Sequence, residues 1–479
     1  MNVIIGNSWP YANGPLHLGR IVVLLPGDVL ARYHRLMGDN VVFISGSDSH
    51  GDLIVSKAKE ENLTPLEIAE KYHEEFVRCF KKLNFSFDVF TKTHTEYHIK
   101  KVKEFLFQIK EKGYIYEENN QLIFALSKFE KDVQKLFIKE QGWRENAINI
   151  TKRYLDGGLR DRALTKDTTW GIDIPFENYE DKKVFVWIEA LMGYLTASIK
   201  YIEEKGEDYL DYWDGEDSRV YLVHGKDNIP FHTVMFPSIL KGIGIKNTNI
   251  REISSESLKL EGKQFSTVKN WALWVDDLGA RYNIDALRYY LILNGPENRV
   301  TDFTWKGFIN TNNNDLVLVY NEFINEVITF IHKNFKGEIP KGEMPKKLQN
   351  EILNLYFNVG DMIEEGEFKK GLQDIMKMIK KYKTFFNREK PWESIYSDLD
   401  KCKNTIYICI QVIINTSNLM EPFMPEAAIK IRNMFGLNEG TWSYIEKKNG
   451  QVSEFKNLFE FIDRKNIIEE IKNLKDKTV

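Results

Sequence analysis

Two patterns of apolar and polar residues follow one another along the chain, and the first predicts alternating strands and helices. Residues 3–6 (VIIG) and 40–48 (NVVFISGSD) are short apolar runs that end in turn-forming residues, as buried strands do. Helical periodicity follows each run, over residues 16–38 and over residues 64–83, where Thr64-Pro65 is a typical helix start. Strands that alternate with helices form a parallel, doubly wound sheet, and such sheets bind ligands at the carboxyl ends of their strands.

The first pattern weakens after residue 113 and then resumes. Residues 113–126 predict a β-hairpin and residues 127–141 a helix. Alternation of strand and helix returns over residues 183–244, which include a GKDN turn after the apolar run VYLV. Residues 251–266 predict a small β element with a loop. We therefore expect a sheet domain in two halves that a short insertion separates.

The second pattern begins near residue 309, where strands disappear and apolar positions recur at helical spacing. Five large apolar residues lie three or four positions apart: Phe368, Leu372, Ile375, Ile379 and Tyr382. This spacing places them on one face of a helix. We interpret residues 309–479 as a helical bundle, in which residues 453–477 form the last helical segment.

Composition and charge restrict the classes of protein that the chain can belong to. With 479 residues it is too long for one core, so two to four domains are expected. The formal net charge is −4, so nucleic-acid binding would have to use local basic patches. The three cysteines form neither a disulfide framework nor a CxxC zinc knuckle. We see no signal peptide and no membrane-spanning run, and we expect a cytoplasmic protein without membrane partners.

The stretch NSWPYANGPLHLGR, residues 7–20, joins the first predicted strand to the first predicted helix. His17 and Gly19 fall in the first turn of that helix, where free N–H groups and the helix dipole favour a phosphate. Gly19 would let a flat ring such as adenine approach the backbone, and His17 can donate a hydrogen bond to a phosphate oxygen. The alternative is an ordinary tight turn with a surface histidine.

Residues 10–19 (PYANGPLHLG) resemble the first signature of class I aminoacyl-tRNA synthetases, in the form that methionyl-tRNA synthetases carry. Seven further segments resemble the same family in the same order: GSDSHG (46–51), LRDRALTKDTTWGIDIP (159–175), FVWIEALMGY (185–194), HGKDNIPFH (224–232), FSTVKNWALWV (265–275), DALRYYL (285–291) and NREKPW (387–392). The resemblance covers nearly the whole chain. It implies a Rossmann-like, doubly wound parallel sheet followed by an α-helical anticodon-binding-type bundle.

The resemblance also implies a division of the chain into five segments. These are the first half of a catalytic domain (1–112), a shortened connective insertion without a zinc knuckle (113–160), the second half of the catalytic domain (161–250), a stem-contact region with the signature loop (251–308) and the bundle (309–479).

The implied reaction has two steps. ATP, with Mg²⁺, and L-methionine or a related amino acid form an aminoacyl-adenylate, and the acyl group then passes to tRNA. By the resemblance, the residues that bind ATP are His17, Gly19, Lys226, Asp227 and Ser266. The catalytic residues would be His17, Gly19, Lys263 and Lys269. The amino acid would lie among Trp9, Tyr11, Asp48, Trp187, Leu191, Tyr194, Asn228 and His232, and tRNA would contact Pro391 and Trp392.

Asp48 also has a physical argument of its own. It ends a predicted central strand, and a buried carboxylate needs a counter-charge, which the α-ammonium group of an amino acid supplies. The alternative is that Asp48 caps the helix that follows.

Four departures from the family bear on zinc, on the signature loop, on the amino-acid pocket and on the anticodon site. The insertion has no cysteine, so we predict no structural zinc. In the loop KQFSTVKN, Gln264 replaces a basic residue and Val268 a serine, which favours a slower adenylation step unless a register shift restores the clamp. Pocket positions also differ: Trp9, Leu191, Asn228 and Met235 stand where leucine, proline, an aliphatic and an aromatic residue are usual.

The anticodon site departs most, because Glu322 and Glu326 stand where the family has Asn and Arg. Two carboxylates one helical turn apart would repel phosphates. The first hypothesis is a compact, zinc-free methionyl-tRNA synthetase, and we expect a monomer. The second is a paralogue that activates another amino acid or uses another acceptor. The third is a catalytically silent binding module.

Overall fold

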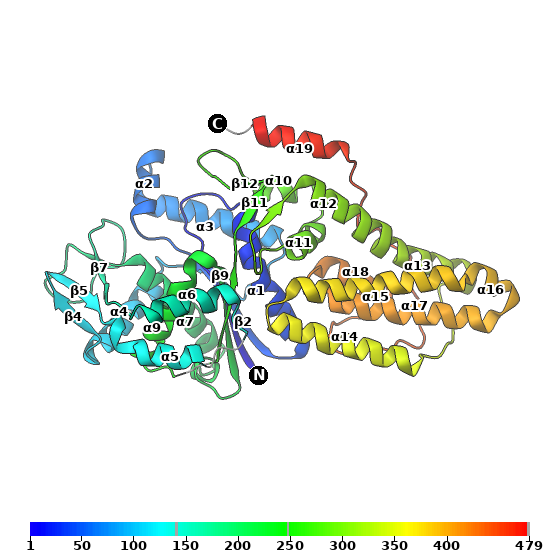
Figure 1. Ribbon diagram of the computed structural model, residues 1–479, viewed down its shortest axis with the longest axis horizontal. Helices are drawn as coiled ribbons and strands as arrows, with labels where there is room; N and C mark the ends of the chain where they lie inside the picture. The colour runs from blue at the N-terminus through cyan, green and yellow to red at the C-terminus, as the bar shows by residue number, and fades with distance from the viewer. Residues whose placement is uncertain (139–141, 247–248, 477–479) are drawn as a thin grey trace.

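The chain is described by a computed structural model over residues 1–138, 142–246 and 249–476 (Figure 1). A five-stranded sheet in the order β10-β9-β1-β2-β3 lies at the centre of its first half, and every ladder in it is parallel. The strands are β1 (Asn2–Asn7), β2 (Asn40–Ser47), β3 (Val89–Lys92), β9 (Ser218–Gly225) and β10 (Ile250–Ser255). The predicted parallel sheet is therefore confirmed.

Helices cover both faces of this sheet. Successive residues of a strand point to opposite faces and are buried in two different hydrophobic cores. Val3 and Ile5 of β1 belong to one core, whereas Ile4 belongs to the other. The helices of this half are α1 (Leu18–Met37), α2 (Asp52–Glu61), α3 (Pro65–Lys82), α4 (Glu96–Glu111), α7 (Val186–Glu204), α8 (Leu210–Trp213) and α9 (Phe236–Ile243). Helix α3 begins at the predicted place, because Thr64 and Glu67 form a reciprocal capping box.

The insertion contains the predicted hairpin, formed by β4 (Ile115–Glu118) and β5 (Gln121–Phe124). Its two-residue turn, Asn119-Asn120, has positive φ at both positions, as the favoured hairpin turn requires. The rest of the insertion contains a 3₁₀ turn (Leu126–Phe129), α5 (Glu130–Ile138) and α6 (Glu145–Asp156). Three short strands follow it: β6 (Arg162–Ala163), β7 (Thr165–Lys166) and β8 (Lys183–Val184). Residues 139–141 of the helix predicted over 127–141 lie outside the described residues.

The prediction for residues 251–266 was partly wrong, because this segment divides between two sheets. Strand β10 is the edge of the main sheet, although it contains Arg251, Glu252 and two serines. A separate small sheet consists of β11 (Leu258–Leu260), β12 (Lys263–Gln264) and β13 (Thr301–Phe303). Helices α10 (Val275–Gly279) and α11 (Ile284–Leu293) connect it to the second half of the molecule.

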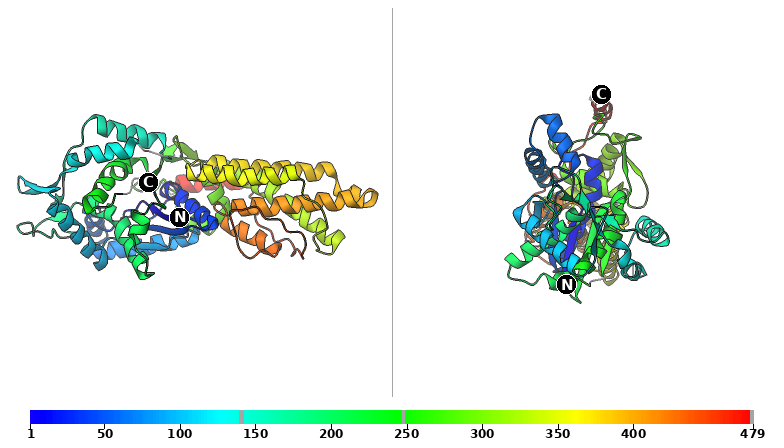
Figure 2. Two further views of the ribbon diagram at one scale, coloured as in Figure 1. Left: turned by 90° about the horizontal axis from the view of Figure 1, so that it is seen from below. Right: turned by 90° about the vertical axis from the view of Figure 1, so that its left-hand side faces the viewer.

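The second half is an elongated helical bundle that extends away from the sheet (Figures 1 and 2). Its elements are α12 (Trp305–Thr311), a π-helical turn (Asn312–Asn321), α13 (Glu322–Phe335), α14 (Lys346–Glu364), α15 (Phe368–Glu389), α16 (Pro391–Ser397), α17 (Leu399–Met420), α18 (Pro425–Met434) and α19 (Lys465–Asp476). The five apolar residues predicted to share a face of α15 are all buried. None of the described helices is long and apolar enough to cross a membrane.

The helix predicted over residues 453–477 begins only at Lys465, and residue 477 lies outside the described part. Residues 453–463 form an irregular strap, because asparagine side chains take up its backbone groups. Asn321 accepts a hydrogen bond from the N–H of Leu458, and Asn312 and Asn313 donate to carbonyl groups of the strap. Helix α19 then returns to the sheet side of the molecule, where Glu470 bonds to Tyr282 (Figure 1).

A buried arginine joins the bundle to the sheet domain. Arg288 on α11 donates from Nη2 to Oδ2 of Asp28 on α1 at 2.6 Å, and both side chains are almost fully buried. The same guanidinium donates to the carbonyl groups of Leu83, Pro422 and Phe423. Because three separate segments depend on one charged group, the orientation of the bundle relative to the sheet is fixed here.

Candidate active site

The candidate site lies at the carboxyl ends of the central strands, between β1 and β9. From β1 the chain builds outward through β2 and β3 on one side, and later through β9 and β10 on the other. The strand order therefore reverses between β1 and β9, and open parallel sheets bind ligands at such a point. Six of the expected site residues follow these strands directly: Trp9, Tyr11, Asp48, Lys226, Asp227 and Asn228.

Asp48 is the buried charge of the site. It lies one residue beyond β2, is 4% exposed, and its Oδ1 has no hydrogen-bond partner among the described residues. Burial, followed by the nearby charge of Glu189, raises the pKa of this carboxyl well above its usual range. The alternative role as a helix cap is wrong, because Gly51 is the N-cap residue of α2. An unpaired buried carboxyl is suited to a cationic ligand.

Glu189 is a second buried carboxylate close to Asp48, but its own oxygens are fully engaged. They lie 2.8 Å from Nδ1 of His50 and 2.9 Å from Nε2 of His98. Tyr11 donates its hydroxyl to the carbonyl oxygen of His50 at 2.6 Å, so it contributes to the site chiefly through its ring. These contacts fix the segment that follows β2 and leave Asp48 as the carboxyl with a free oxygen.

Trp9 forms one wall beside this acid, and two glycines make room for it. A Cβ atom on Gly46 would lie 2.3 Å from Cζ3 of Trp9, and one on Gly193 would lie 2.9 Å from Cζ2. The indole meets the ring of Tyr194 edge to face at 6.3 Å between centroids. Its Nε1 is buried, with no partner within the described part of the chain.

The other expected pocket residues lie on α7 and after β9. The hydroxyl oxygen of Tyr194 lies 2.9 Å from Nε2 of His232, and Nδ1 of His232 lies 2.9 Å from the carbonyl oxygen of Asn228. Asn228 therefore takes part through its backbone. Trp187 is 36% exposed and stacks on Phe231 at 4.4 Å. Two departures from the family, Leu191 and Met235, are buried apolar side chains.

His17 and Gly19 lie at the start of α1, as predicted. His17 is the N-cap residue, and burial, followed by the charge of Arg20, lowers its pKa to about 3. Its ring stacks on Phe265 of the signature loop at 4.9 Å. A Cβ atom on Gly19 would lie 3.0 Å from the ring of Phe265. The space over Gly19 is therefore occupied by Phe265 in this conformation.

Two charged residues near the nucleotide positions were not assigned from the sequence. Arg20 has a buried Nη1 without a partner in the described ranges, so it is available for an anion. Glu256 forms an ion pair of 3.0 Å with Lys226, whereas Asp227 is exposed. The sequence gives no local signal for this pair, because the two residues are 30 positions apart.

The signature loop is mostly exposed. Lys263 lies over the ring of Trp271, with Nζ 4.5 Å from the centroid, and Val268 is 91% exposed. Ser266 accepts a hydrogen bond from the backbone N–H of Lys269 at 3.2 Å. The loop therefore forms a turn whose two lysines are exposed to solvent.

Comparisons with known proteins decide the family. The family model described as tRNA synthetases class I (M) matches residues 3–124 and 116–328. The chain belongs to the class I methionyl-tRNA synthetases. A second model, the anticodon binding domain of methionyl tRNA ligase, matches residues 337–474. The resemblance stated from the sequence is confirmed.

Individual methionine--tRNA ligases are similar to this chain over nearly their full length. The chain is 40% identical to methionine--tRNA ligase 1 of Alkaliphilus oremlandii (strain OhILAs), with 99% of this chain and 100% of that protein covered. It is 38% identical to methionine--tRNA ligase of Bacillus cereus (strain B4264), with 99% of each covered. Its fold is similar to the crystal structure of Mycobacterium tuberculosis methionyl-tRNA synthetase bound by methionyl-adenylate (TM-score 0.87, 20% identity, 96% of this chain and 100% of that one).

Methionyl-tRNA synthetases have an anticodon-binding domain, and here the two unusual carboxylates occupy the start of α13. Glu322 forms an ion pair of 2.8 Å with Lys383 of α15, which offsets its charge. Burial raises the pKa of Glu326, and its Oε2 has no partner within the described residues. Trp392, at the start of α16, is 43% exposed beside Phe386, while Pro391 is buried.

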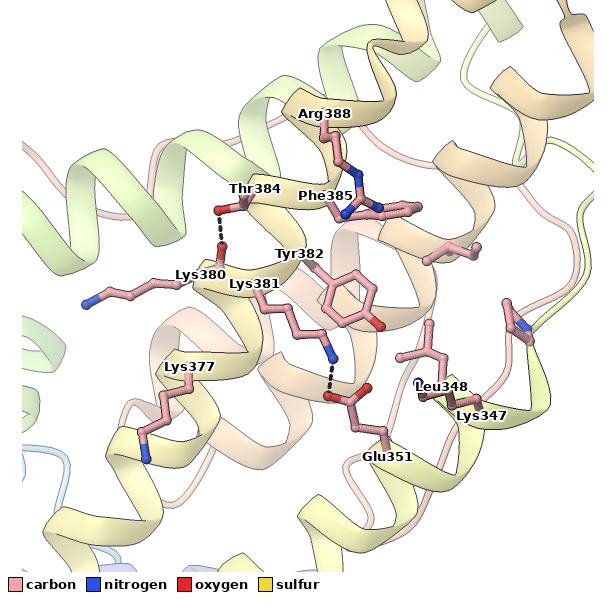
Figure 3. A pocket seen from close by; sticks show the side chains of 12 residues that line it. Lys347, Leu348, Glu351, Lys377, Lys380, Lys381, Tyr382, Thr384, Phe385 and Arg388 are labelled. Atoms are coloured by element: carbon pink, nitrogen blue, oxygen red, sulfur yellow. Dashed lines mark hydrogen bonds and ion pairs between the residues drawn. The ribbon is translucent and has the colours of Figure 1, made fainter.

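A groove with basic walls lies between α14 and α15 of this domain (Figure 3). Its volume is about 710 Å³. Five basic residues line it: Lys347, Lys377, Lys380, Lys381 and Arg388. Lys381 is paired with Glu351, and the guanidinium of Arg388 lies over the ring of Phe385 (Figure 3). Lys377 and Lys380 are paired with Asp374 and Asp315, so three of the five positive charges have a carboxylate partner.

No group of three or more His, Cys, Asp or Glu side chains that could hold a metal ion occurs among the described residues. Cys79, Cys402 and Cys409 are all buried and free. The absence of structural zinc stays a prediction.

Proposed function

We propose that this chain is a methionine--tRNA ligase, which activates L-methionine with MgATP and transfers the methionyl group to tRNA. The observation that carries the proposal is the unpaired, buried Asp48 at the switch point of the sheet, beside a wall of aromatic side chains. The names of the full-length relatives support the same substrate. No observation on the described residues favours the paralogue or the silent module.

Asp48 receives the α-ammonium group of methionine in this proposal. The ammonium group supplies the missing counter-charge, and binding therefore favours the ionised form of the carboxyl. Trp9, Tyr11, Trp187, Leu191 and Tyr194 surround the side chain, with His232 and the backbone of Asn228 behind Tyr194. Polarizable sulfur packs well against aromatic rings, which suits a thioether.

Adenylation is an in-line displacement. The methionine carboxylate attacks the α-phosphorus of ATP, the bond from that phosphorus to the bridging oxygen breaks, and pyrophosphate leaves. Mg²⁺ that arrives with ATP would offset part of the negative charge of the leaving group. His17 is uncharged at neutral pH and serves as a hydrogen-bond donor, while Arg20 supplies positive charge at the same helix start. Lys263, Ser266 and Lys269 contact the leaving pyrophosphate when the loop closes on it.

Two rearrangements precede ATP binding in this proposal. Phe265 moves off Gly19 so that the adenine ring can lie there, and Lys226 exchanges Glu256 for the nucleotide, with Asp227 close to the ribose. Both changes involve exposed or partly exposed side chains, so their cost is small. The present conformation is therefore one with the nucleotide site closed by its own side chains.

The bundle, residues 309–479, binds tRNA in this proposal, and residues 251–308 connect it to the catalytic halves at 1–112 and 161–250. Trp392 stacks on an anticodon base, with Pro391 fixing the start of α16. We place the reaction in the cytoplasm and expect one chain to carry a complete site, so that a monomer suffices.

The test is charging of a methionine tRNA with a CAU anticodon by the purified protein. The wild-type chain is compared with the Asp48→Asn variant. The amide keeps the shape of the acid but cannot pair with an ammonium group. We expect charging by the wild-type chain and a loss of roughly 10²-fold or more in kcat/KM for methionine in the variant. Charging with another amino acid would support the paralogue instead.

A further inference from the structure

A buried acid–histidine pair lies directly behind the amino-acid pocket. Glu252 on β10 and His224 on β9 are both fully buried, and Oε2 of Glu252 lies 2.8 Å from Nε2 of His224. The ring of His224 stacks on the ring of His232 at 4.1 Å, with 13° between their planes. His232 in turn contacts the hydroxyl of Tyr194. A continuous polar path therefore runs from the sheet interior to the pocket.

The geometry determines how many protons this pair holds. Nδ1 of His224 lies 3.0 Å from the carbonyl oxygen of Gly225, which can only accept, so Nδ1 carries a hydrogen. In a neutral ring Nε2 is then an acceptor, and Glu252 has to donate as a protonated acid. The other arrangement is an imidazolium beside a carboxylate. Either way, one proton lies between Oε2 and Nε2.

The surroundings favour the uncharged arrangement at neutral pH. Burial raises the pKa of Glu252 to about 8, against a smaller opposite effect of His232. Burial, helped by the charge of Arg144 and opposed by the hydrogen bond to Gly225, lowers the pKa of His224 to about 4. Oε1 of Glu252 has no partner in the described part of the chain, so a carboxylate there would be poorly solvated.

The charged and titratable groups around Glu252 come from four elements. His224 is on β9, His232 is in the π-helical turn Phe231–Met235, and Tyr194 is on α7. Arg144 precedes α6, and its guanidinium donates to Ser254, Ser255 and Gly366. Burial raises the pKa of Tyr194, and the negative charge of Glu252 raises it further.

Assigning hydrogens to the ring nitrogens in the same way determines the direction of the Tyr194–His232 hydrogen bond in the pocket. Nδ1 of His232 donates to the carbonyl oxygen of Asn228, so Nε2 accepts and Tyr194 donates its hydroxyl proton. Burial, followed by the charge of His224, lowers the pKa of His232 to about 3, although the charge of Glu252 opposes this. His232 is therefore neutral whichever form Glu252 takes. Loss of the shared proton would instead leave two acceptors, Oε2 of Glu252 and Nε2 of His224, 2.8 Å apart, and their repulsion would displace the ring that stacks on His232.

We propose that Glu252 and His224 are positioning residues of the amino-acid pocket, whose shared proton holds the His224 ring against His232 and so keeps His232 in place to accept from the Tyr194 hydroxyl. This inference rests on the proposed function, since it concerns the pocket assigned to methionine. Loss of the shared proton weakens amino-acid binding and leaves the phosphate chemistry unchanged. It therefore changes KM for methionine and not kcat.

The test is methionine-dependent pyrophosphate exchange between pH 6.5 and 8.8, in the wild-type chain and in Glu252→Gln. The amide of glutamine donates to Nε2 of His224 as the protonated acid does, but it does not titrate. For a group with a pKa of about 8, we expect KM for methionine to rise about sevenfold over this range in the wild type. In Glu252→Gln we expect no such rise, while kcat and KM for ATP match the wild type.

The α-amino group of methionine titrates in the same range, but it affects both proteins alike and cancels in their ratio. Asp285→Asn is the matched control. Asp285 is a buried acid on α11, outside the pocket, and burial raises its pKa to about 6. We expect this variant to keep the wild-type pH profile. An equal rise of KM in Glu252→Gln, or a flat profile in the wild type, would overturn the inference.

A second measurement needs no activity. In protein with ¹⁵N-labelled histidine, we expect His224 and His232 to carry hydrogen on Nδ1 from pH 6.5 to 7.5 in both proteins. Above pH 8, their signals should shift in the wild type and stay fixed in Glu252→Gln. Signals that shift equally in both would refute the shared proton. Absent exchange with methionine at every pH would instead refute the proposed function and leave this readout to decide the inference.

Discussion

Substituting Gly193 by alanine tests the placement of Trp9 against α7. Its effect on stability should be unfavourable with tryptophan at position 9 and favourable with leucine there. In the wild type, the new Cβ would lie 2.9, 3.0 and 3.1 Å from three atoms of the Trp9 ring. The ring cannot retreat toward Gly46, where a Cβ would be 2.3 Å from it, so it is pushed toward the pocket. Such overpacking costs about 1–3 kcal/mol.

A second effect opposes this cost. Gly193 lies inside α7, and replacing a helical glycine by alanine stabilises by about 1 kcal/mol. We therefore expect Gly193→Ala to destabilise the wild-type chain by up to about 2 kcal/mol. In a Trp9→Leu background the steric contact is gone and only the helix preference remains. There the same substitution should stabilise by about 1 kcal/mol or less.

The assay is a double-mutant cycle on thermal midpoints, with KM for methionine measured in parallel. In the wild-type background KM should rise roughly five- to thirtyfold, since the displaced indole enters the pocket. In the Trp9→Leu background it should change by less than about twofold. Effects of equal sign and size in both backgrounds would show that the two residues do not touch, and the pocket wall would have to be assigned elsewhere.

Three further outcomes follow from the site and the bundle. His17→Ala should slow adenylate formation by roughly 10²-fold or more, measured in single-turnover reactions, and an unchanged rate would remove His17 from the chemistry. Elemental analysis should find no stoichiometric zinc, whereas one zinc per chain would contradict the prediction from the cysteine-free insertion. Glu322→Asn combined with Glu326→Arg should tighten binding of a CAU-anticodon tRNA by about tenfold, and unchanged binding would mean that α13 does not meet the anticodon.

The elements that could be predicted from sequence are those with strong local signals. The capping box of Thr64 and Glu67 fixes the start of α3, and the Asn119-Asn120 turn specifies a hairpin. Apolar runs identified β1, β2 and β9, because strands buried on both faces have little need of polar residues. These features depend on neighbours in sequence, so no tertiary information was needed.

The place of β10 in the main sheet was missed because its polar residues are buried through distant partners. Arg251 pairs with Glu365 of the bundle, and Glu252 bonds to His224. The prediction of a helix over residues 453–463 was wrong for a related reason. Its apolar residues have helical spacing, but asparagines about 140 positions away hold it extended. Long-range hydrogen bonds overrode the local pattern in both cases.

Site residues divide in the same way. His17, Gly19 and Asp48 could be chosen because each follows a predicted strand at the sheet edge where ligands bind. The Lys226–Glu256 pair, the ring of Phe265 over Gly19 and the proton-sharing pair behind His232 could not be chosen. Each joins segments whose approach only the folded chain establishes, and polar residues in a predicted loop give no sign of such partners.

The central claim is that the pocket beside Asp48 takes methionine, and pyrophosphate exchange with each amino acid in turn tests it most directly. The account predicts exchange that depends on methionine and exceeds exchange with any other amino acid by about tenfold or more, because the aromatic walls and the free carboxyl act together. Exchange with a different amino acid, or none with any, would contradict it.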